Sequence, residues 1–294
     1  MTRIASHGQR YPESASAERA LREKIDQSAG PDDQKVFLHR MVDEALKSGF
    51  WSYLLLNGGL NGYWTDYLVH KHYLQDGVAR IYHELPIQKA TQQRNQIFMR
   101  TLQGLVREGI GIASVPCGLM RDVLALDFGG CRAFTLDGYD LDEESIGRAR
   151  RLAGEYGLAD HARFFVADAW TVGAGNAERY DVCVSNGLNI YVPEPERVVA
   201  LYRSLLDCLK PGGLLITSCL TYPPDVADKT EWDLAAVNAE ALKLSRLLFG
   251  LFQPRWSSFR TTAETTGQLR EAGFSDIEIR NDDARIMPTF LARK

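Results

Sequence analysis

The chain has 294 residues, of which 45% are hydrophobic and 24% are charged. These proportions are ordinary for a globular protein, and they exclude a disordered or fibrous one. The formal net charge is -4 and no run rich in lysine or arginine occurs, so the sequence offers no long-range attraction to nucleic acid or to an anionic membrane surface. A small molecule is therefore the expected partner.

Five cysteines are scattered along the chain without a C-x-x-C pair: Cys117, Cys131, Cys183, Cys208 and Cys219. We interpret them as free thiols of a reducing compartment. The sequence shows no signal-peptide core, and no apolar run approaches the roughly 18 residues that span a bilayer. It therefore predicts a cytoplasmic protein that is neither secreted nor membrane-spanning.

The first hundred or so residues are predicted to be helical. In residues 17–29 and 32–47 apolar side chains recur every three or four positions, and Asp32 is a candidate N-cap of the second helix. Residues 86–107 form a third helical pattern, which leads to the first predicted strand without a Gly/Ser linker. We therefore expect residues 1–108 to form a helical N-terminal cap that packs on a second domain, residues 109–294.

Residues 50–73 have the most unusual local composition of the chain. Their aromatic and histidine residues are Phe50, Trp51, Tyr53, Tyr63, Trp64, Tyr67, His70, His72 and Tyr73. Residues 57–62 read NGGLNG, which marks a turn or a mobile loop because asparagine and glycine tolerate positive φ. One interpretation of the stretch is an aromatic packing cluster between helices. The other is a lid in which Tyr63 and Trp64 meet a cationic ligand.

A strand, a turn and a helix are predicted in residues 110–122, IGIASVPCGLMRD. An apolar run breaks at residues 116–118, and a second apolar run, residues 133–136, leads into the acidic turn of residues 138–142. A strand, a glycine-containing turn, a helix and a second strand that ends in carboxylates follow one another in a nucleotide-binding βαβ unit. The order of these elements predicts such a unit here.

This stretch resembles the first motif of the class I S-adenosylmethionine-dependent methyltransferases, in which a strand ends in Asp-x-Gly-x-Gly-x-Gly. The chain keeps the middle glycine, Gly118, and has Ser114 in place of the acid. Pro116 replaces the first glycine and Met120 the third. Because glycines serve positions of positive φ or close ligand approach, two losses predict a reshaped turn under the methionine half of the cofactor. The residues that the resemblance implies for cofactor binding in this turn are Ser114, Val115, Pro116 and Gly118.

Later segments resemble further motifs of the same family, in the same order. Asp140 ends the second predicted strand, where a carboxylate can accept both ribose hydroxyls of S-adenosylmethionine, and Asp142 is the alternative. Asp168 follows the third predicted strand and matches the acid that accepts from the adenine amino group. Residues 180–187 resemble the fourth strand, and residues 209–217 resemble the L-K-P-G-G-x-L turn and the fifth. Further cofactor-binding residues implied by the resemblance are Leu141, Ala169 and Ser185.

The loop after the fourth predicted strand, residues 186–196, faces the departing group in this family. Its polar residues Asn186, Asn189 and Tyr191 are candidates for orienting a nucleophile, and ordinary loop structure is their alternative role. The loop lacks the Asn/Asp-Pro-Pro-Tyr/Phe signature that recognises a planar amide or an exocyclic amine. This disfavours methylation of DNA adenine or of glutamine.

The remaining segments complete the predicted fold. Residues 221–258 interrupt the succession from the fifth strand to the last helix, and residues 231–252 of this insertion are predicted to be helical. A last helix at residues 260–272 and two closing strands at residues 276–280 and 285–292 follow. The predicted fold class is α/β, a seven-stranded Rossmann-like class I methyltransferase sandwich with a helical N-terminal cap.

The function that the resemblance implies is methyl transfer from S-adenosylmethionine to a small amine, alcohol or acid. Tyr63 and Trp64 are the catalytic candidates of the cap, because aromatic faces attract the sulfonium. Two other functions stay open. A few relatives of this fold cyclise S-adenosylmethionine to azetidine-2-carboxylate and methylthioadenosine, and the altered motif suits such a change. The third function is non-catalytic S-adenosylmethionine binding.

The sequence predicts no metal cofactor. His70 and His72 are two residues apart, which places them on opposite sides of a helix and disfavours a shared metal ion. The sequence does not determine the oligomeric state.

Overall fold

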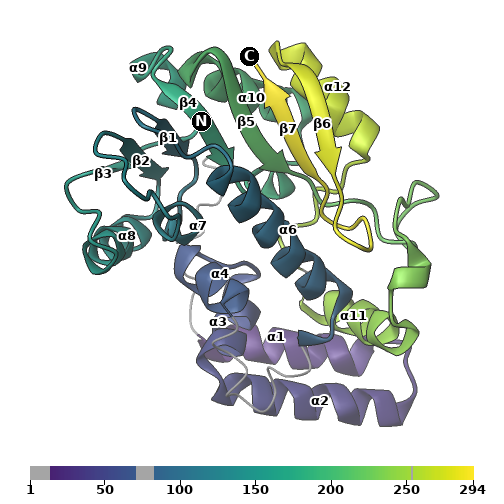
Figure 1. Cartoon of the computed structure of the whole chain (residues 1–294). Coiled ribbons are helices and arrows are strands. Elements are labelled where there is room, and N and C mark those ends of the chain that lie inside the picture. The colour runs from purple at the N-terminus through teal and green to yellow at the C-terminus, as the bar shows by residue number, and fades with distance from the viewer. Residues whose placement is uncertain (1–13, 71–82, 253) are drawn as a thin grey trace.

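The computed structural model describes residues 14–70, 83–252 and 254–294 of the chain (Figure 1). His72 and Tyr73 of the aromatic stretch lie outside these residues. Figure 1 shows a layer of helices from the N-terminal part at one end of the molecule and a twisted sheet at the other. Over the described ranges, no helix has both the length and the apolar character needed to cross a membrane.

Seven strands form one mixed sheet in the order β3-β2-β1-β4-β5-β7-β6. Their bounds are β1 Gly111–Ser114, β2 Thr135–Asp140, β3 Ala162–Val166, β4 Tyr180–Ser185, β5 Leu209–Ser218, β6 Ser275–Arg280 and β7 Thr289–Arg293. β7 is antiparallel to β5 and β6, and the other neighbours are parallel. The predicted seven-stranded α/β fold is confirmed. The order reverses between β1 and β4, which is where open sheets of this kind hold their ligands.

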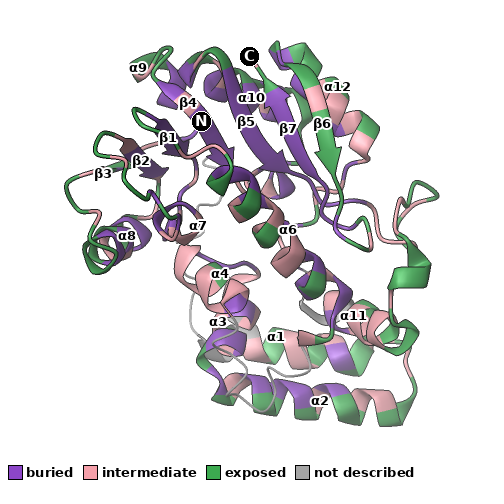
Figure 2. Cartoon of the chain, in the orientation of Figure 1, coloured by how far each residue is buried: buried purple, intermediate pink, exposed green. Residues whose placement is uncertain are grey.

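Successive residues of the inner strands alternate between two hydrophobic layers. Ile112 of β1 faces the first layer and Ala113 the second, and Val182 and Cys183 of β4 repeat this alternation. Helices α6 (Pro86–Gln103), α7 (Arg121–Leu124) and α8 (Glu143–Glu155) contribute to the first layer. Helices α9 (Val172–Gly175), α10 (Pro195–Cys208) and α12 (Thr262–Ala272) contribute to the second. Figure 2 shows the result, a buried centre at β4 and β5 and an exposed edge at β6.

The N-terminal cap begins with helices α1 (Ser14–Gln27), α2 (Asp32–Lys47), α3 (Gly49–Asn57) and α4 (Gly62–Val69). The prediction that Asp32 caps α2 is wrong, because Asp32 is already helical and Pro31 occupies the N-cap position without a side-chain bond. Between α3 and α4, Gly58 adopts a left-handed conformation with φ 59°, and the Asn61 side chain caps α4 by accepting from the Trp64 N–H. Residues 57–62 are thus a packed turn between two helices.

The insertion after β5 is less helical than predicted. Helix α11 spans Ala239–Phe252, and only the short 3-10 turn η3 (Leu234–Ala236) precedes it, so the prediction of helix from residue 231 is wrong. The Glu231 carboxylate instead accepts from the N–H and the hydroxyl of Thr262, at 2.9 and 2.8 Å. This contact fastens the start of the insertion to the N-terminus of α12.

The last strand also begins later than predicted, at Thr289 and not at residue 285. The reason is Asp282, which is buried and uses its carboxylate to bind backbone N–H groups of the following segment. The donors are Ala284, Ile286 and Met287. Backbone groups that bind a side chain in this way cannot join a strand ladder at the same time.

A third hydrophobic cluster joins the cap to the rest of the chain. From the cap it contains Phe50 and Trp51, which are almost fully buried and whose ring centroids lie 5.4 Å apart. From the C-terminal part it contains Leu248, Trp256 and Met287. The cap and the sheet domain therefore share part of one core, and the domain boundary at residue 108 stays a prediction.

One carboxylate is completely buried within the sheet. Asp137 on β2 has no exposed surface, and its two oxygens accept from Nε and Nη2 of Arg163, both at 2.8 Å. The Tyr180 hydroxyl donates to the same carboxylate at 2.6 Å. Burial and the bond to Asp137 raise the pKa of Tyr180, so the phenol stays protonated. A buried carboxylate is stable only while such partners compensate its charge.

We expect Arg163→Met to lower the free energy of unfolding by about 3 kcal/mol, because it leaves the Asp137 charge buried without its bidentate partner. Arg203→Met is the matched control, since Arg203 forms an exposed ion pair with Glu271 and such pairs contribute about 1 kcal/mol or less. Urea denaturation of the two variants gives the comparison. Equal losses of unfolding free energy in the two variants would show that the buried pair of Asp137 and Arg163 stabilises the fold no more than an exposed ion pair does.

Candidate functional site

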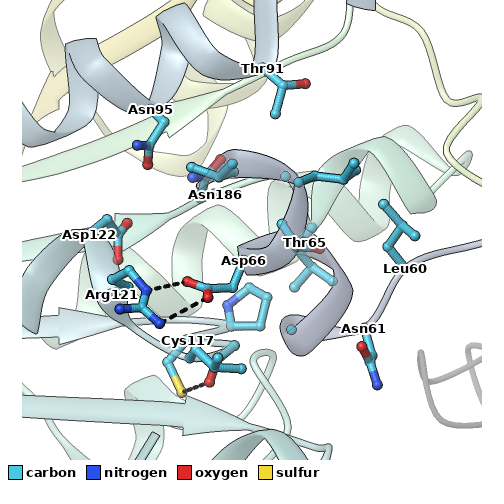
Figure 3. A pocket seen from close by; sticks show the side chains of 18 of the residues that line it. Leu60, Asn61, Thr65, Asp66, Thr91, Asn95, Cys117, Arg121, Asp122 and Asn186 are labelled. Atoms are coloured by element: carbon cyan, nitrogen blue, oxygen red, sulfur yellow. Dashed lines mark hydrogen bonds and ion pairs between the residues drawn. The ribbon is translucent and has the colours of Figure 1, made fainter. Parts of the chain in front are cut away.

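A cavity of about 180 Å³ lies where the strand order reverses, at the carboxyl ends of β1 and β4. Its walls come from the turn between β1 and α7, from α4, from α6 and from the loop after β4. Figure 3 shows side chains of α4, α6 and α7, among them Asp66, Asn95 and Asp122, gathered around this space. Because charged and amide groups form much of the wall, we call it the polar cavity.

The turn between β1 and α7 carries positive φ at two positions. Gly118 has φ 51° and Met120, which replaces the third glycine of the motif, has φ 57°. The left-handed conformation costs a residue other than glycine roughly 1–2 kcal/mol. The Met120 side chain is buried in the first hydrophobic layer, which offsets this cost. The bond between Val115 and Pro116 is cis.

Asp140 holds this turn from the end of β2. One carboxylate oxygen accepts from the Gly118 N–H at 2.8 Å, and the other accepts from the Asp142 N–H at 3.0 Å. Burial raises the pKa of Asp140, and the backbone donors oppose that rise. A carboxylate has about four lone-pair sites, so Asp140 keeps acceptor capacity for a ligand. The alternative, Asp142, caps the N-terminus of α8. Its carboxylate accepts from the Glu144 N–H and from the Ser145 hydroxyl.

Helix α4 covers one side of the polar cavity and rests directly on the turn. A Cβ at Gly62 would lie 2.6 Å from the Cα of Gly118, so the two backbones approach this closely only because residue 62 is glycine. Arg121 of α7 adds a bidentate ion pair, in which Nε and Nη2 donate to the Asp66 carboxylate at 2.7 and 3.1 Å (Figure 3). The cap is therefore fastened to the turn by a backbone contact and by an ion pair.

The ion pair is well shielded from solvent. The side chains of Asp66 and Arg121 are 9% and 23% exposed. Burial acts to raise the pKa of Asp66, but hydrogen bonds from His70 and Arg121 hold that pKa below its ordinary value. Asp66 is thus a carboxylate at neutral pH.

The two aromatic candidates of the cap, Tyr63 and Trp64, lie away from the polar cavity. The Arg148 guanidinium lies over the Tyr63 ring, 4.2 Å from its centroid, and Trp64 packs against Phe50 with ring centroids 5.8 Å apart. The residues of α4 that line the cavity are Gly62, Thr65, Asp66, Leu68 and Val69. Residues three or four apart share a helix face, so Gly62, Thr65, Asp66 and Val69 form one row and positions 63 and 64 fall beside it. Their placement favours the packing interpretation over the lid.

The loop after β4 brings two of its three candidates to the polar cavity. Asn186 and Tyr191 line it, and Oδ1 of Asn186 is buried without a hydrogen-bond partner among the described residues. Burial raises the pKa of Tyr191, so its hydroxyl stays protonated. Asn189, in the 3-10 turn η2 (Asn189–Tyr191), instead donates from Nδ2 to the Tyr202 hydroxyl and to the Ser218 carbonyl, at 2.9 and 2.8 Å. This favours a structural role for Asn189.

The predicted cofactor residues divide into three groups. Those that line the polar cavity are Ser114, Pro116, Gly118 and Asp140. The side chains of Val115 and Ala169 are buried in the second hydrophobic layer, and the Ser185 carbonyl accepts from Thr217 at 2.9 Å. Leu141 and Asp168 lie at the carboxyl ends of β2 and β3, where both are exposed. The structure thus gathers four of the predicted cofactor residues at the polar cavity and leaves Leu141 and Asp168 at an open surface.

Helix α6 supplies a row of cavity residues that the sequence analysis missed. Ile87, Thr91, Arg94 and Asn95 line the polar cavity and share one helix face. Arg94 is only 5% exposed, and burial lowers its pKa to about 10. The available sequence signal is the polar group at positions 91, 94 and 95, which interrupts the apolar periodicity of this helix. Asp66, Arg121 and Asp122 were not predicted either.

The described part of the chain contains no group of three or more His, Cys, Asp or Glu side chains that could hold a metal ion.

Comparisons with known proteins identify the class. Residues 112–213 match a family model described as a methyltransferase domain. S-adenosylmethionine-dependent methyltransferase SibL, solved in its apo form, is 16% identical over 88% of this chain and 75% of its own, with a TM-score of 0.52. A candidate O-methyltransferase from Nostoc punctiforme PCC 73102 is 16% identical over 85% of this chain and 71% of its own, with a TM-score of 0.53. At this identity the two structures show the shared fold.

The chain has the fold of the class I S-adenosylmethionine-dependent methyltransferases, and the match of residues 112–213 to a methyltransferase domain implies S-adenosylmethionine as its cofactor. It belongs to the same family as a possible exported protein from Bordetella parapertussis. The two are 40% identical over 96% of this chain and 95% of that one, with a TM-score of 0.91. A search of the curated proteins finds no match.

The Asp122 carboxyl of α7 should make the stability of the protein depend on pH. It lines the polar cavity, and burial raises the pKa of its carboxyl to about 6. The unfolded chain has the ordinary value near about 3.9, so the folded state binds more protons between these two values. The free energy of unfolding therefore falls as pH rises through this window.

We expect Asp122→Asn to raise the melting temperature of the ligand-free protein at about pH 7.5, and we expect the gain to shrink toward zero below about pH 4. The reason is that the variant removes a buried negative charge which costs up to about 3 kcal/mol, at roughly 1.4 kcal/mol for each pKa unit. Thermal unfolding over this pH range gives the measurement. Asp160→Asn, at an exposed position, is the control. A gain for Asp122→Asn that is independent of pH would contradict the assignment.

Proposed function

We propose that this chain transfers the methyl group of S-adenosylmethionine to a small-molecule nucleophile. The observation that carries the proposal is the polar cavity itself, which lies at the strand-order reversal and is lined by residues of α4 and α6. A cavity of about 180 Å³ suits a small acceptor, because it has no room for more than a small chemical group. The net charge of -4 also disfavours nucleic acid as the acceptor.

The residues around Asp140 fit the cofactor. Its remaining lone pairs suit the two ribose hydroxyls, and Asp142 is less available because it caps α8. Leu141 and Val166, which are 50% and 51% exposed, offer apolar surface to the adenine ring, and Asp168 offers an acceptor to its amino group. The polar cavity is smaller than the roughly 300–1,000 Å³ of sites that hold a whole drug-sized ligand. It therefore suits the methionine end, while the adenosine extends over the adjoining surface.

The bound cofactor supplies an electrophilic methyl group on a cationic sulfur, and the protein supplies proximity and the exclusion of water. Helix α4 excludes water by covering the turn. The substrate that receives the methyl group can donate a hydrogen bond to Oδ1 of Asn186 and accept one from the protonated hydroxyl of Tyr191. These two bonds would orient it. Asp122, with a pKa of about 6, can take a proton from the acceptor near neutral pH.

A second cavity supports an acceptor with an apolar body. It has a volume of about 510 Å³ and lies between the cap, the start of α6 and the insertion, and we call it the apolar chamber. Most of its wall is hydrophobic: Leu54, Leu85, Ile87, Leu220, Pro223, Val226, Trp232, Leu242, Leu248, Phe249, Pro254, Trp256 and Phe259. Ile87 and Trp256 belong to the walls of both cavities. Nε1 of Trp232 is buried without a partner among the described residues, so it can donate to one polar atom of a ligand.

We also propose a cytoplasmic location and a role in small-molecule biosynthesis. All five cysteines are free thiols, the state that a reducing compartment maintains. The description of the Bordetella relative as a possible exported protein is the competing indication.

Product analysis tests the reaction class. Purified protein is incubated with S-adenosylmethionine, with and without a panel of small amines, alcohols and acids, and a heat-killed sample is the control. We expect S-adenosylhomocysteine in the mass spectrum only when an acceptor is present. Formation of methylthioadenosine and azetidine-2-carboxylate in the absence of any acceptor would show that the reaction is cyclisation and not methyl transfer. Binding of the cofactor without any product would indicate a non-catalytic protein.

Filling the apolar chamber tests where the acceptor binds. Ser245 of α11 lines the chamber, whereas Lys243 lies on the exposed face of the same helix. We expect Ser245→Trp to raise the KM of an acceptor found in the panel by roughly tenfold or more, because such pocket contacts contribute about 1–3 kcal/mol. Its affinity for S-adenosylhomocysteine should stay unchanged. Lys243→Trp adds the same side chain to the same helix and should alter neither quantity. A KM unchanged in both variants would place the acceptor elsewhere.

A further inference from the structure

Arg94 is a buried cation without a partner in the described structure. Its side chain is 5% exposed and lines the polar cavity. No hydrogen bond or ion pair joins its guanidinium to any residue that the structure describes, and its Nε is fully enclosed without an acceptor. A Cβ at Gly187 would lie 3.7 Å from Nη1, so the guanidinium reaches the carboxyl end of β4. The cation thus lies at the edge of the space where the reaction would take place.

The nearby acids act on Arg94 through space without binding it. The Asp282 carboxylate is engaged by the backbone N–H groups of the segment before β7. Asp122 also lines the cavity and contributes favourably to the arginine charge. Burial lowers the pKa of Arg94 to about 10, so the side chain is still a cation at neutral pH. Its five donors therefore have capacity for an anion.

A second buried arginine shows how this fold satisfies a structural guanidinium. Arg260 is also 5% exposed. Its Nη1 donates to the carbonyls of Asn189 and Ser258, at 2.9 and 3.0 Å, and its Nη2 donates to the carbonyl of Val192. Arg94 has the same burial and none of these bonds, which points to a ligand as its missing partner.

We propose that Arg94 is the carboxylate-binding residue of the polar cavity. The planar fork of a guanidinium pairs with a carboxylate through two parallel hydrogen bonds, and burial strengthens the pair. Asp122, Asp140 and Asp142 also line the cavity, as do Asp66 and Arg121, which neutralise each other in their ion pair. An anionic group is therefore repelled from the first three of these positions and directed to Arg94. The proposal deepens the proposed function and rests on it.

Two carboxylates have the required chemistry, that of the methionine half of the cofactor and one carried by the acceptor. Calorimetric titration of the wild type and Arg94→Gln with two ligands separates them. The first ligand is S-adenosylhomocysteine, and the second is S-adenosyl-3-thiopropylamine, which keeps the amino group and lacks the carboxylate. If Arg94 binds the methionine carboxylate, the substitution weakens S-adenosylhomocysteine roughly ten- to hundredfold. The affinity of the amine should then be unaffected.

An acceptor carboxylate gives a different pattern. In that case Arg94→Gln leaves the affinities of both adenosyl ligands unaffected. Benzoate then raises the melting temperature of the wild type, both when the protein is ligand-free and when it is saturated with S-adenosylhomocysteine. It does not raise the melting temperature of the variant. Arg203→Gln, which removes an exposed charge on α10, should match the wild type throughout. Arg94→Lys keeps the charge without the fork and should show a partial loss of whichever affinity depends on Arg94.

Each outcome bears on one proposal or the other. Equal affinities and equal benzoate responses in the wild type and Arg94→Gln would overturn the role of Arg94. A wild type that binds neither adenosyl ligand would overturn the proposed function, and the benzoate response of the ligand-free protein would still decide whether Arg94 binds a carboxylate. Misfolding is not expected to obscure these results, because the substitution removes an uncompensated buried charge, and the melting temperature of the ligand-free variant checks this.

Discussion

The close approach of the Gly62 and Gly118 backbones determines how the cap sits on the sheet. Gly62 begins α4 and Gly118 lies in the turn after β1, so the contact joins the entrance of one helix to the cofactor turn. The bidentate pair between Asp66 and Arg121 lies one helical turn further along and fixes the direction of α4. With α4 fixed, the face that carries Thr65 and Asp66 must look into the polar cavity and the aromatic faces must look away. Which residues form the cavity wall therefore depends on two glycines, Gly62 and Gly118.

Charge is distributed unevenly around this wall. Asp122, Asp140 and Asp142 give it a negative character, and Arg94 provides a positive group on α6. Under the proposed function such surroundings favour the sulfonium form of the cofactor, because an acidic site attracts a cation. Methyl transfer turns the sulfonium into a neutral thioether and removes this attraction. The site would then hold the spent cofactor less tightly than the fresh one, which helps exchange.

The sequence was sufficient to predict the strands of the sheet. Apolar runs located β1, β2 and β4, and the residues at the ends of the first two, Ser114 and Asp140, both line the polar cavity, because strand ends in a parallel sheet meet at one edge. The sequence predicted less about which helical residues line the site. A helix has several faces, and composition alone does not show which face a neighbouring element covers. Tyr63 and Trp64 belong to the stretch of most unusual composition, but they fall beside the cavity-lining row of α4. Asn189 has a polar side chain whose partners lie far away in sequence, on α10 and β5.

The left-handed conformation of Met120 has a consequence for substitutions in this turn. Glycine there would relieve roughly 1–2 kcal/mol of backbone strain, but it would also empty a buried methionine site, a change that typically costs about 2–5 kcal/mol. Packing outweighs strain, so the side chain is retained where the motif calls for none. A search that counts glycines treats this turn as degenerate, whereas a search by backbone torsion angle would recognise it. Divergent members of such a family are therefore better aligned by conformation than by residue type at this position.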